Sequence, residues 1–406
     1  MTKVGMGPVL ATLLVAGNMI GSGLYLLPVS LAPFGGSSLL AWIVAGAGAL
    51  AIAGVYALLG RLVPEADGVI DYPRRALHPV AGFVAWAAYW VSCWGGNAAI
   101  ALAAIGYLAA LFPVLGGPVA TFAALLALLW IFTLVNLTGA RGVARLGGAS
   151  LVIGLIPVIA AIVLGLAAFD ADLFAKGWNP SARPLSDTVP AAVVLVFWAF
   201  LGMESANAAA SKVRDPARTL PIAAIGGVLI AIVVYILASV AVQGVMSPED
   251  LGRSTAPFAD VVSRLAGPIA GAVVAACAAI KALGTLAGWI FVSAETSRAG
   301  ATAGYLPRLF SETDPAVVPR RGILVTGVLM TATAFATMAP AISQQFNLVI
   351  GFAVAAFMLV YALGAAALIR EAAALSTPAR RIGARALALA ALAFSVWIIL
   401  VWASGL

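Results

Sequence analysis

The chain has 406 residues, of which 63% are hydrophobic and only 9% are charged, and its mean hydropathy is +1.10. Soluble globular domains carry about 25% charged residues, so this composition excludes a soluble protein and indicates a polytopic membrane protein. The net charge of +7 would suit nucleic acid, but the cations lie in short loops between apolar stretches, and we expect no nucleic-acid partner.

The sequence also argues against several kinds of site chemistry. Cys93 and Cys277 both lie inside apolar stretches, which argues against a disulfide framework. His78 is the only histidine, which excludes His-cluster metal sites and argues against a Ser-His-Asp triad. We therefore expect no metal, no cofactor and no enzyme activity.

Apolar stretches long enough to cross a lipid bilayer, about 20 residues each, recur along almost the whole chain. We predict an all-α fold with eleven spanning helices. The first stretch is too long, and has the wrong flanks, for a cleaved signal peptide. The predicted spans lie near 8–33, 38–62, 77–112, 119–138, 145–169, 188–211, 219–245, 266–299, 322–340, 345–369 and 384–404.

The cations between these spans are distributed unevenly. Cytoplasmic loops carry an excess of Lys and Arg, so the distribution places the N-terminus in the cytoplasm, the C-terminus outside and the chain in a cytoplasmic (inner) membrane. One side holds only Lys176, Arg183, Arg253 and Arg264. The other side holds Lys3, Arg61, Arg74, Arg75, Arg141, Arg145, Lys212, Arg214, Arg218, Arg298, Arg308, Arg320, Arg321, Arg370, Arg380, Arg381 and Arg385.

The first predicted span is interrupted by Gly17–Gly23, where three of seven residues are glycine. Each glycine inside a helix costs about 1 kcal/mol relative to alanine, and backbone freed at mid-membrane must line a cavity or be buried in protein. A half-helix that begins after such a break suits a carboxylate, and Ser22 can add a hydroxyl. Close helix packing through small residues is the alternative.

The sixth span carries a similar defect at Gly202–Ser205, which includes the carboxylate of Glu204. Spans 1 and 6 each begin a run of five, and the two runs start on opposite sides of the membrane. Two interrupted helices at corresponding places in inverted halves indicate the binding site of a transporter.

Aromatic and polar residues at mid-span are further candidates for substrate contacts. Trp198 and Trp289 could place an indole face over a cation, although tryptophan also faces lipid at membrane interfaces. On the third span, Cys93 and Asn97 share one helix face and Ser92 precedes them. Helix–helix hydrogen bonds are the alternative for these three residues.

Glu204 and Lys281 lie well inside predicted spans, and such residues mark functional sites by default. Glu204 could carry a proton, balance a cationic substrate, or form a gate with tyrosines such as Tyr89 and Tyr361, which could equally be packing aromatics. Lys281 stands about 12 Å along its helix from Trp289. It could snorkel outward, neutralise a carboxylate, or act as a fixed cation in place of a coupling ion.

Seven stretches of the sequence together form a specific pattern, although none is specific alone. They are Gly17–Pro28, Tyr89–Asn97, Phe197–Ser205, Asp215–Val228, Ser254–Phe258, Gly284–Trp289 and Gln345–Tyr361. In combination they resemble the amino acid–polyamine–organocation superfamily, in particular its arginine/agmatine and ornithine/putrescine antiporters.

The resemblance implies a LeuT-like fold of two inverted five-helix repeats with helices 1 and 6 unwound at the centre. The first repeat would cover residues 1–170, the second 187–371, and an accessory helix 372–406. Because the family usually has twelve helices and the twelfth is absent here, we expect altered oligomer contacts rather than altered chemistry. A homodimer is left open.

The resemblance also implies the residues of the site. Its substrate-binding positions correspond to Asn18, Met19, Ser22, Gly23, Ser92, Cys93, Asn97, Trp198, Leu201, Gly202, Trp289 and Ala353. Its gating positions correspond to Tyr89, Glu204, Trp289 and Tyr361, with Lys281 as a further coupling candidate.

Three departures bear on the substrate. A gate tyrosine of the family aligns with Ile70, a pocket serine aligns with Ala353, and Lys281 stands where a small residue is expected. A fixed positive charge near the pocket would disfavour dicationic amines.

The function implied is secondary-active transport of an amino acid, basic or otherwise, or of its amine. The transporter would work by alternating access, as an exchanger or with proton coupling. The alternatives are a neutral amino acid permease of the same superfamily, a membrane sensor that binds an amino acid without moving it, and a membrane enzyme.

Overall fold

The computed structural model describes residues 7–20, 22–66, 68–204, 215–311, 317–339 and 341–405. Over these ranges the chain forms helices and no strand, as the sequence predicts. The first half comprises α1 (Pro8–Met19), α2 (Ser22–Tyr25), α3 (Leu27–Leu31), η1 (Gly35–Ser37), α4 (Ser38–Leu62), α5 (Asp71–Ala76), α6 (Pro79–Leu111), η2 (Pro113–Gly116), α7 (Pro118–Asn136), α8 (Ala140–Ile153), α9 (Leu155–Ala167) and α10 (Ala171–Lys176).

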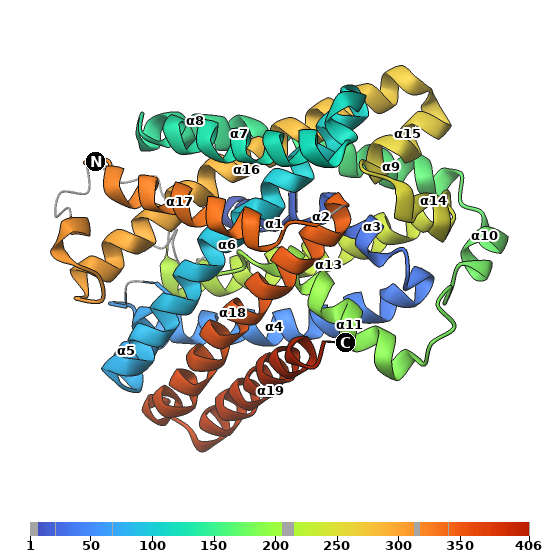
Figure 1. Cartoon of the computed structure of the whole chain (residues 1–406). Helices are drawn as coiled ribbons and strands as arrows, with labels where there is room; N and C mark the ends of the chain where they lie inside the picture. Colours follow the sequence, from blue (N-terminus) through green and yellow to red (C-terminus); the bar gives the residue numbers. More distant parts are fainter. Residues whose placement is uncertain are drawn as a thin grey trace.

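The second half is also helical and begins with a short helix that ends in a 3₁₀ turn. It comprises α11 (Leu185–Phe197), η3 (Trp198–Phe200), α13 (Pro216–Gln243), α14 (Pro248–Arg253), α15 (Pro257–Ala266), α16 (Pro268–Thr302), η5 (Arg308–Phe310), α17 (Arg320–Ala336), α18 (Ile342–Glu371), η6 (Ala372–Ala374) and α19 (Pro378–Ala403). The long helices run roughly side by side (Figure 1).

Eight helical stretches of the described chain are long and apolar enough to cross a membrane. They are Gly35–Leu62, Pro79–Leu111, Pro118–Asn136, Leu146–Ala167, Arg218–Gln243, Pro268–Thr302, Ile342–Ala374 and Pro378–Ala403. A ninth is a pair, Pro8–Met19 and Gly23–Leu31, bent by 49°. The predicted sixth and ninth spans correspond to the shorter apolar helix Leu185–Phe200 and to α17, so the total of eleven stays a prediction.

Helix starts follow local sequence rules. Pro is the first residue of α6, α7, α16 and α19, where its missing N–H breaks no helical hydrogen bond. The Thr377 hydroxyl accepts a hydrogen bond from the Arg380 N–H and caps α19.

Glycines let several helices approach one another closely. A Cβ at Gly46 of α4 would lie 2.9 Å from Ile232 of α13, and a Cβ at Gly227 of α13 would lie 2.6 Å from Val15 of α1. Small residues serve this purpose in membranes, where apolar surface alone does not drive helices together. They bring α1 and α4 against α13, while α6 packs along both α16 and α18.

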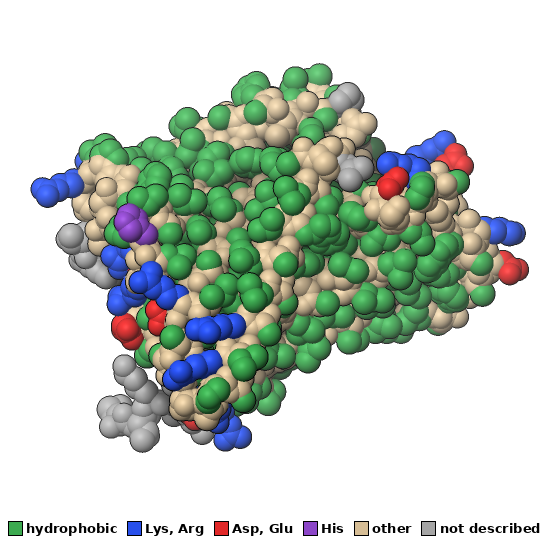
Figure 2. Space-filling view, turned by 90° about the horizontal axis from the view of Figure 1, so that it is seen from below, with side chains coloured by type: hydrophobic (Ala, Val, Ile, Leu, Met, Phe, Trp, Pro, Cys, Tyr) green, Lys and Arg blue, Asp and Glu red, His purple; other side chains and the backbone are tan. Residues whose placement is uncertain are grey.

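The surface divides into an apolar band and two charged ends. Figure 2 shows hydrophobic side chains covering the middle of this face, with Lys and Arg gathered mainly at one end. The loops predicted to be cytoplasmic contain exposed arginines, namely Arg74, Arg75, Arg370, Arg380 and Arg381. Only 22% of the apolar window of α7 is buried inside the protein, which is what a lipid-facing helix requires.

Candidate functional site

A cavity lies where the broken first span meets η3, α6, α16 and α18. The space not filled by atoms there, including the part open to solvent, is about 440 Å³. Its lining consists of Asn18, Met19, Gly23, Ser92, Cys93, Gly96, Asn97, Ile100, Trp198, Ala199, Leu201, Thr285, Trp289 and Phe357.

The first break bounds one side of this cavity. α1 ends at Met19, and Ile20 is extended (φ −75°, ψ 111°) before α2 begins at Ser22. Asn18, Met19 and Gly23 all line the cavity. Gly21 and the side chain of Ser22 lie outside the described part of the structure, so the predicted hydroxyl of Ser22 stays a prediction.

The second break bounds the neighbouring side. α11 gives way to η3, Leu201 is extended (ψ 139°), and Gly202 has φ +98°, a conformation that other residues rarely adopt. The Tyr235 hydroxyl donates a 2.7 Å hydrogen bond to the Ala199 carbonyl and so satisfies one freed backbone acceptor. Leu201 lines the cavity, whereas Gly202 lies behind it and faces Trp289. Ser205 lies outside the described residues.

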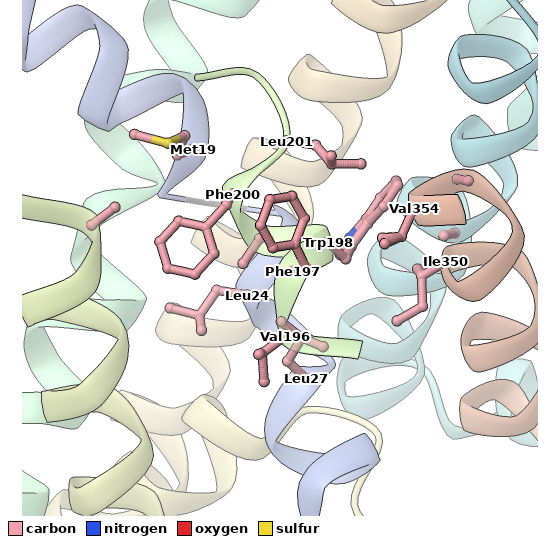
Figure 3. Close-up of a cluster of buried hydrophobic side chains, with 14 of the residues drawn as sticks. Met19, Leu24, Leu27, Val196, Phe197, Trp198, Phe200, Leu201, Ile350 and Val354 are labelled. Atoms are coloured by element: carbon pink, nitrogen blue, oxygen red, sulfur yellow. The ribbon is translucent and has the colours of Figure 1, made fainter. Parts of the chain in front are cut away.

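Trp198 is held between glycines of two different helices. A Cβ at Gly96 of α6 would lie 2.8 Å from Cη2 of the indole, and a Cβ at Gly23 would lie 3.5 Å from its Nε1. Figure 3 shows Trp198 extending toward Val354, while Phe200 points to the other side of η3. The indole is 8% exposed, and its buried N–H has no hydrogen-bond partner among the described residues.

The α6 side chains differ in what they offer to a ligand. The Ser92 hydroxyl donates to the carbonyls of Ala88 (2.8 Å) and Ala353 (3.2 Å), which supports the helix-packing alternative for Ser92. Asn97 is fully buried; its amide nitrogen lies 3.2 Å from Sδ of Met330. Its Oδ1 has no partner within the part of the chain that is described. A buried acceptor left unpaired is costly, so Asn97 is ready to accept a donor from a ligand.

The candidate gate lies next to the cavity rather than in its lining. Oε2 of Glu204, which is 7% exposed, accepts hydrogen bonds from the Tyr361 hydroxyl (2.8 Å) and the Gly202 N–H (3.2 Å). The ring of Tyr89 meets Phe357 edge-on at 5.3 Å. The predicted grouping of Glu204 with Tyr361 is therefore present, and Tyr89 joins it through Phe357.

Phe357 is the main residue that sequence reasoning missed. It lines the cavity and contacts Trp289 (6.3 Å between ring centroids) and Tyr361 (5.9 Å). Its spacing was informative, because Phe357 stands four residues from both Ala353 and Tyr361 and so shares their helix face. Gly96, Ile100, Ala199 and Thr285 were also missed.

Gly202 and the candidate gate aside, Ala353 and Lys281 are also absent from the lining. Ala353 of α18 is fully buried against α6, and its carbonyl accepts a hydrogen bond from the Ser92 hydroxyl. Lys281 is 6% exposed and lies one turn from Thr285 on α16. Among the described residues, no group of three or more His, Cys, Asp or Glu side chains could hold a metal ion.

Comparisons with known proteins place this chain in a family. A model of the amino acid permease family matches residues 6–403. The chain is 33% identical to the putrescine transporter PotE of Escherichia coli strain K12 over 364 residues, which cover 90% of this chain and 83% of that protein. It is 36% identical to the cadaverine/lysine antiporter of the same strain over 361 residues, covering 88% and 81% respectively. It is also 32% identical to a putrescine transporter PotE of Haemophilus influenzae over 362 residues, covering 89% and 83%. The chain therefore belongs to the amino acid permease family, within the amino acid–polyamine–organocation superfamily.

Proposed function

We propose that this protein is a secondary-active antiporter that exchanges a basic amino acid or an amine across the cytoplasmic membrane, without covalent chemistry. One observation carries the proposal: a cavity at the junction of two helix breaks is lined both by Trp198 and by Asn97, whose Oδ1 has no partner among the described residues. The names of the relatives, a putrescine transporter and a cadaverine/lysine antiporter, support a substrate with at least one ammonium group.

Two parts of the lining would hold the two ends of the substrate. An ammonium or guanidinium group can donate to Oδ1 of Asn97 and stack on the indole of Trp198, a contact that contributes about 0.5–2 kcal/mol. A carboxylate would dock at the first break, where α2 begins at Ser22 and the indole N–H of Trp198 lies beside Gly23.

Alternating access would come from two inverted repeats, residues 1–170 and 187–371, with 372–406 as an accessory helix. Repeats related by a two-fold axis place equivalent helices side by side near that axis. In agreement, α4 packs on α13, α6 on α16 and α7 on α17. Trp289 and Phe357 would move as the repeats rock, and the charge distribution supports a cytoplasmic N-terminus.

The proposal is tested with purified protein in liposomes. Liposomes loaded with unlabelled lysine should take up labelled lysine faster than empty liposomes, because exchange requires substrate on both sides. Trp198→Leu and Asn97→Leu should each raise the half-saturating concentration about tenfold, which corresponds to about 1.4 kcal/mol. Trp402→Leu, at a side chain that is 41% exposed on α19, is the matched control.

Three outcomes would count against the proposal. Uptake that does not depend on internal substrate would contradict exchange. Unchanged affinity in both site variants would contradict the site. Ligand-induced thermal stabilisation without flux would indicate a sensor instead.

A further inference from the structure

Lys281 is a buried cation that the proposed binding mode does not use. It lies on α16, is 6% exposed, and its carbonyl accepts a 2.9 Å hydrogen bond from the hydroxyl of Thr285, which lines the cavity. Four residues of helix rise about 6 Å and turn by about 40° from the starting azimuth. Lys281 therefore lies on nearly the same face as Thr285, one turn beyond the cavity.

The Lys281 side chain occupies space left open by Gly154, a glycine between α8 and α9. Gly154 separates α8 from α9, and a Cβ added there would overlap Cβ, Cγ and Cδ of Lys281. The Gly154 carbonyl also accepts a 2.8 Å hydrogen bond from the Tyr25 hydroxyl. Tyr25 ends α2, two residues after Gly23 of the cavity lining. Lys281 is thus packed behind the half-helix where we expect a substrate carboxylate.

No carboxylate in the described ranges forms an ion pair with Lys281; the ion pairs found there involve other residues. Glu204, a carboxylate beside the cavity, already accepts hydrogen bonds from Tyr361 and Gly202. Buried charges in membranes are normally paired. A substrate that brings a negative group close to Lys281 therefore gains an attraction that an otherwise identical diamine lacks.

We propose that Lys281 makes the cavity select substrates that carry a carboxylate over the diamines with the same cationic end. The inference rests on the proposed function and names its substrate class. Over about 10 Å, at an effective dielectric constant of about 20, one unit of charge changes affinity about tenfold. The Lys281 charge should therefore raise the ratio of lysine affinity to cadaverine affinity about tenfold.

Ligand pairs that differ only by the carboxylate isolate this effect. We would measure dissociation constants of lysine against cadaverine, and of ornithine against putrescine, for wild-type protein, Lys281→Met, Lys281→Arg and Lys281→Gln in detergent. The matched control is Lys176→Met, which removes an exposed lysine of α10. The readout is the ratio of the two affinities within each pair, and a structural role for Lys281 would not change this ratio.

The inference predicts that Lys281→Met shifts both ratios about tenfold toward the diamine, while Lys281→Arg and Lys176→Met keep the wild-type ratios. If Lys281→Met does not fold, Lys281→Gln should give the same shift. An unchanged ratio in a folded Met or Gln variant overturns the inference alone. If none of the four ligands binds to wild-type protein, the proposed function is overturned, and this inference with it.

Discussion

Gly96→Ala should reduce substrate affinity by pushing Trp198 into the cavity. The new Cβ would stand 2.8 Å from Cη2 and 3.1 Å from Cζ3 of the indole, whereas carbon atoms in contact prefer about 3.5–4.0 Å. The ring must therefore move by about 1 Å, and it can move only into the cavity that it lines. A bound substrate would have to push the ring back against the added methyl group. Overpacking of this kind costs about 1–3 kcal/mol, so affinity should fall about 5- to 150-fold.

The neighbouring glycine provides a matched control. A Cβ at Gly95 would lie 3.5 Å from the ring of Phe352, an ordinary contact, and Gly95 is not part of the lining. Lysine dissociation constants and melting temperatures would be measured for wild type and for both single variants. Affinity should fall in Gly96→Ala and stay within about twofold of wild type in Gly95→Ala. Equal affinities in two folded variants would refute the placement of Trp198 in the site.

Three further substitutions separate binding from packing. Tyr361→Phe removes the hydroxyl that donates to Glu204. This variant should have a free energy of unfolding about 1–3 kcal/mol lower than wild type and should exchange substrate more slowly in liposomes. Unchanged stability and exchange rate would argue against a gate. Ser92→Ala should change lysine affinity less than about threefold, because the hydroxyl is already bonded to Ala88 and Ala353; a tenfold loss would make Ser92 a substrate ligand instead. Gly154→Ala should destabilise the protein by about 1–3 kcal/mol through overlap with Lys281, measured as a lower melting temperature. Adding Lys281→Ala to this variant should restore most of the lost stability. If it does not, the two residues are not in contact.

The helices were predictable because the membrane imposes long apolar stretches with polar ends. The predicted spans near 38–62 and 119–138 match α4 and α7 closely, whereas α19 begins at Pro378, six residues before the predicted start near 384. The break in the first span was also visible as glycine content, and the structure bends the chain by 49° there. The start of the sixth span was misplaced by three residues, because Pro184 allows α11 to begin at Leu185.

The cavity was less predictable, because its shape depends on contacts between distant helices. Ala353 was expected in the lining, by resemblance, since a pocket serine aligns there. In the structure, Trp198 fills the space against Gly96, and Ala353 lies behind it, 3.7 Å from where a Gly96 Cβ would be. Phe357 takes a place in the lining instead. Ala353 and Phe357 lie on one face of α18, and no local sequence pattern predicts which of them reaches the cavity. The packing of Trp198 against Gly96 of another helix decides it.

A series of aromatic contacts connects the cavity to the end predicted to be cytoplasmic. It runs from Trp289 to Phe357 (6.3 Å between centroids), then to Tyr361 (5.9 Å), Tyr56 (5.8 Å) and Tyr72 (6.1 Å). Burial, with a smaller contribution from Asp71, raises the pKa of Tyr72 to about 12, so its phenol is neutral at physiological pH.

Each contact in this series contributes about 0.5–1.5 kcal/mol beyond the area it buries. In the gate that we propose, the contacts together would resist passage of substrate, while each of them would separate at modest cost. Asp71 anchors the far end through ion pairs with Arg74 and Arg75. Tyr361 donates to Glu204, which also accepts from the second break at Gly202. Through Glu204, a change at the break would therefore reach the aromatic series, which we propose opens for release.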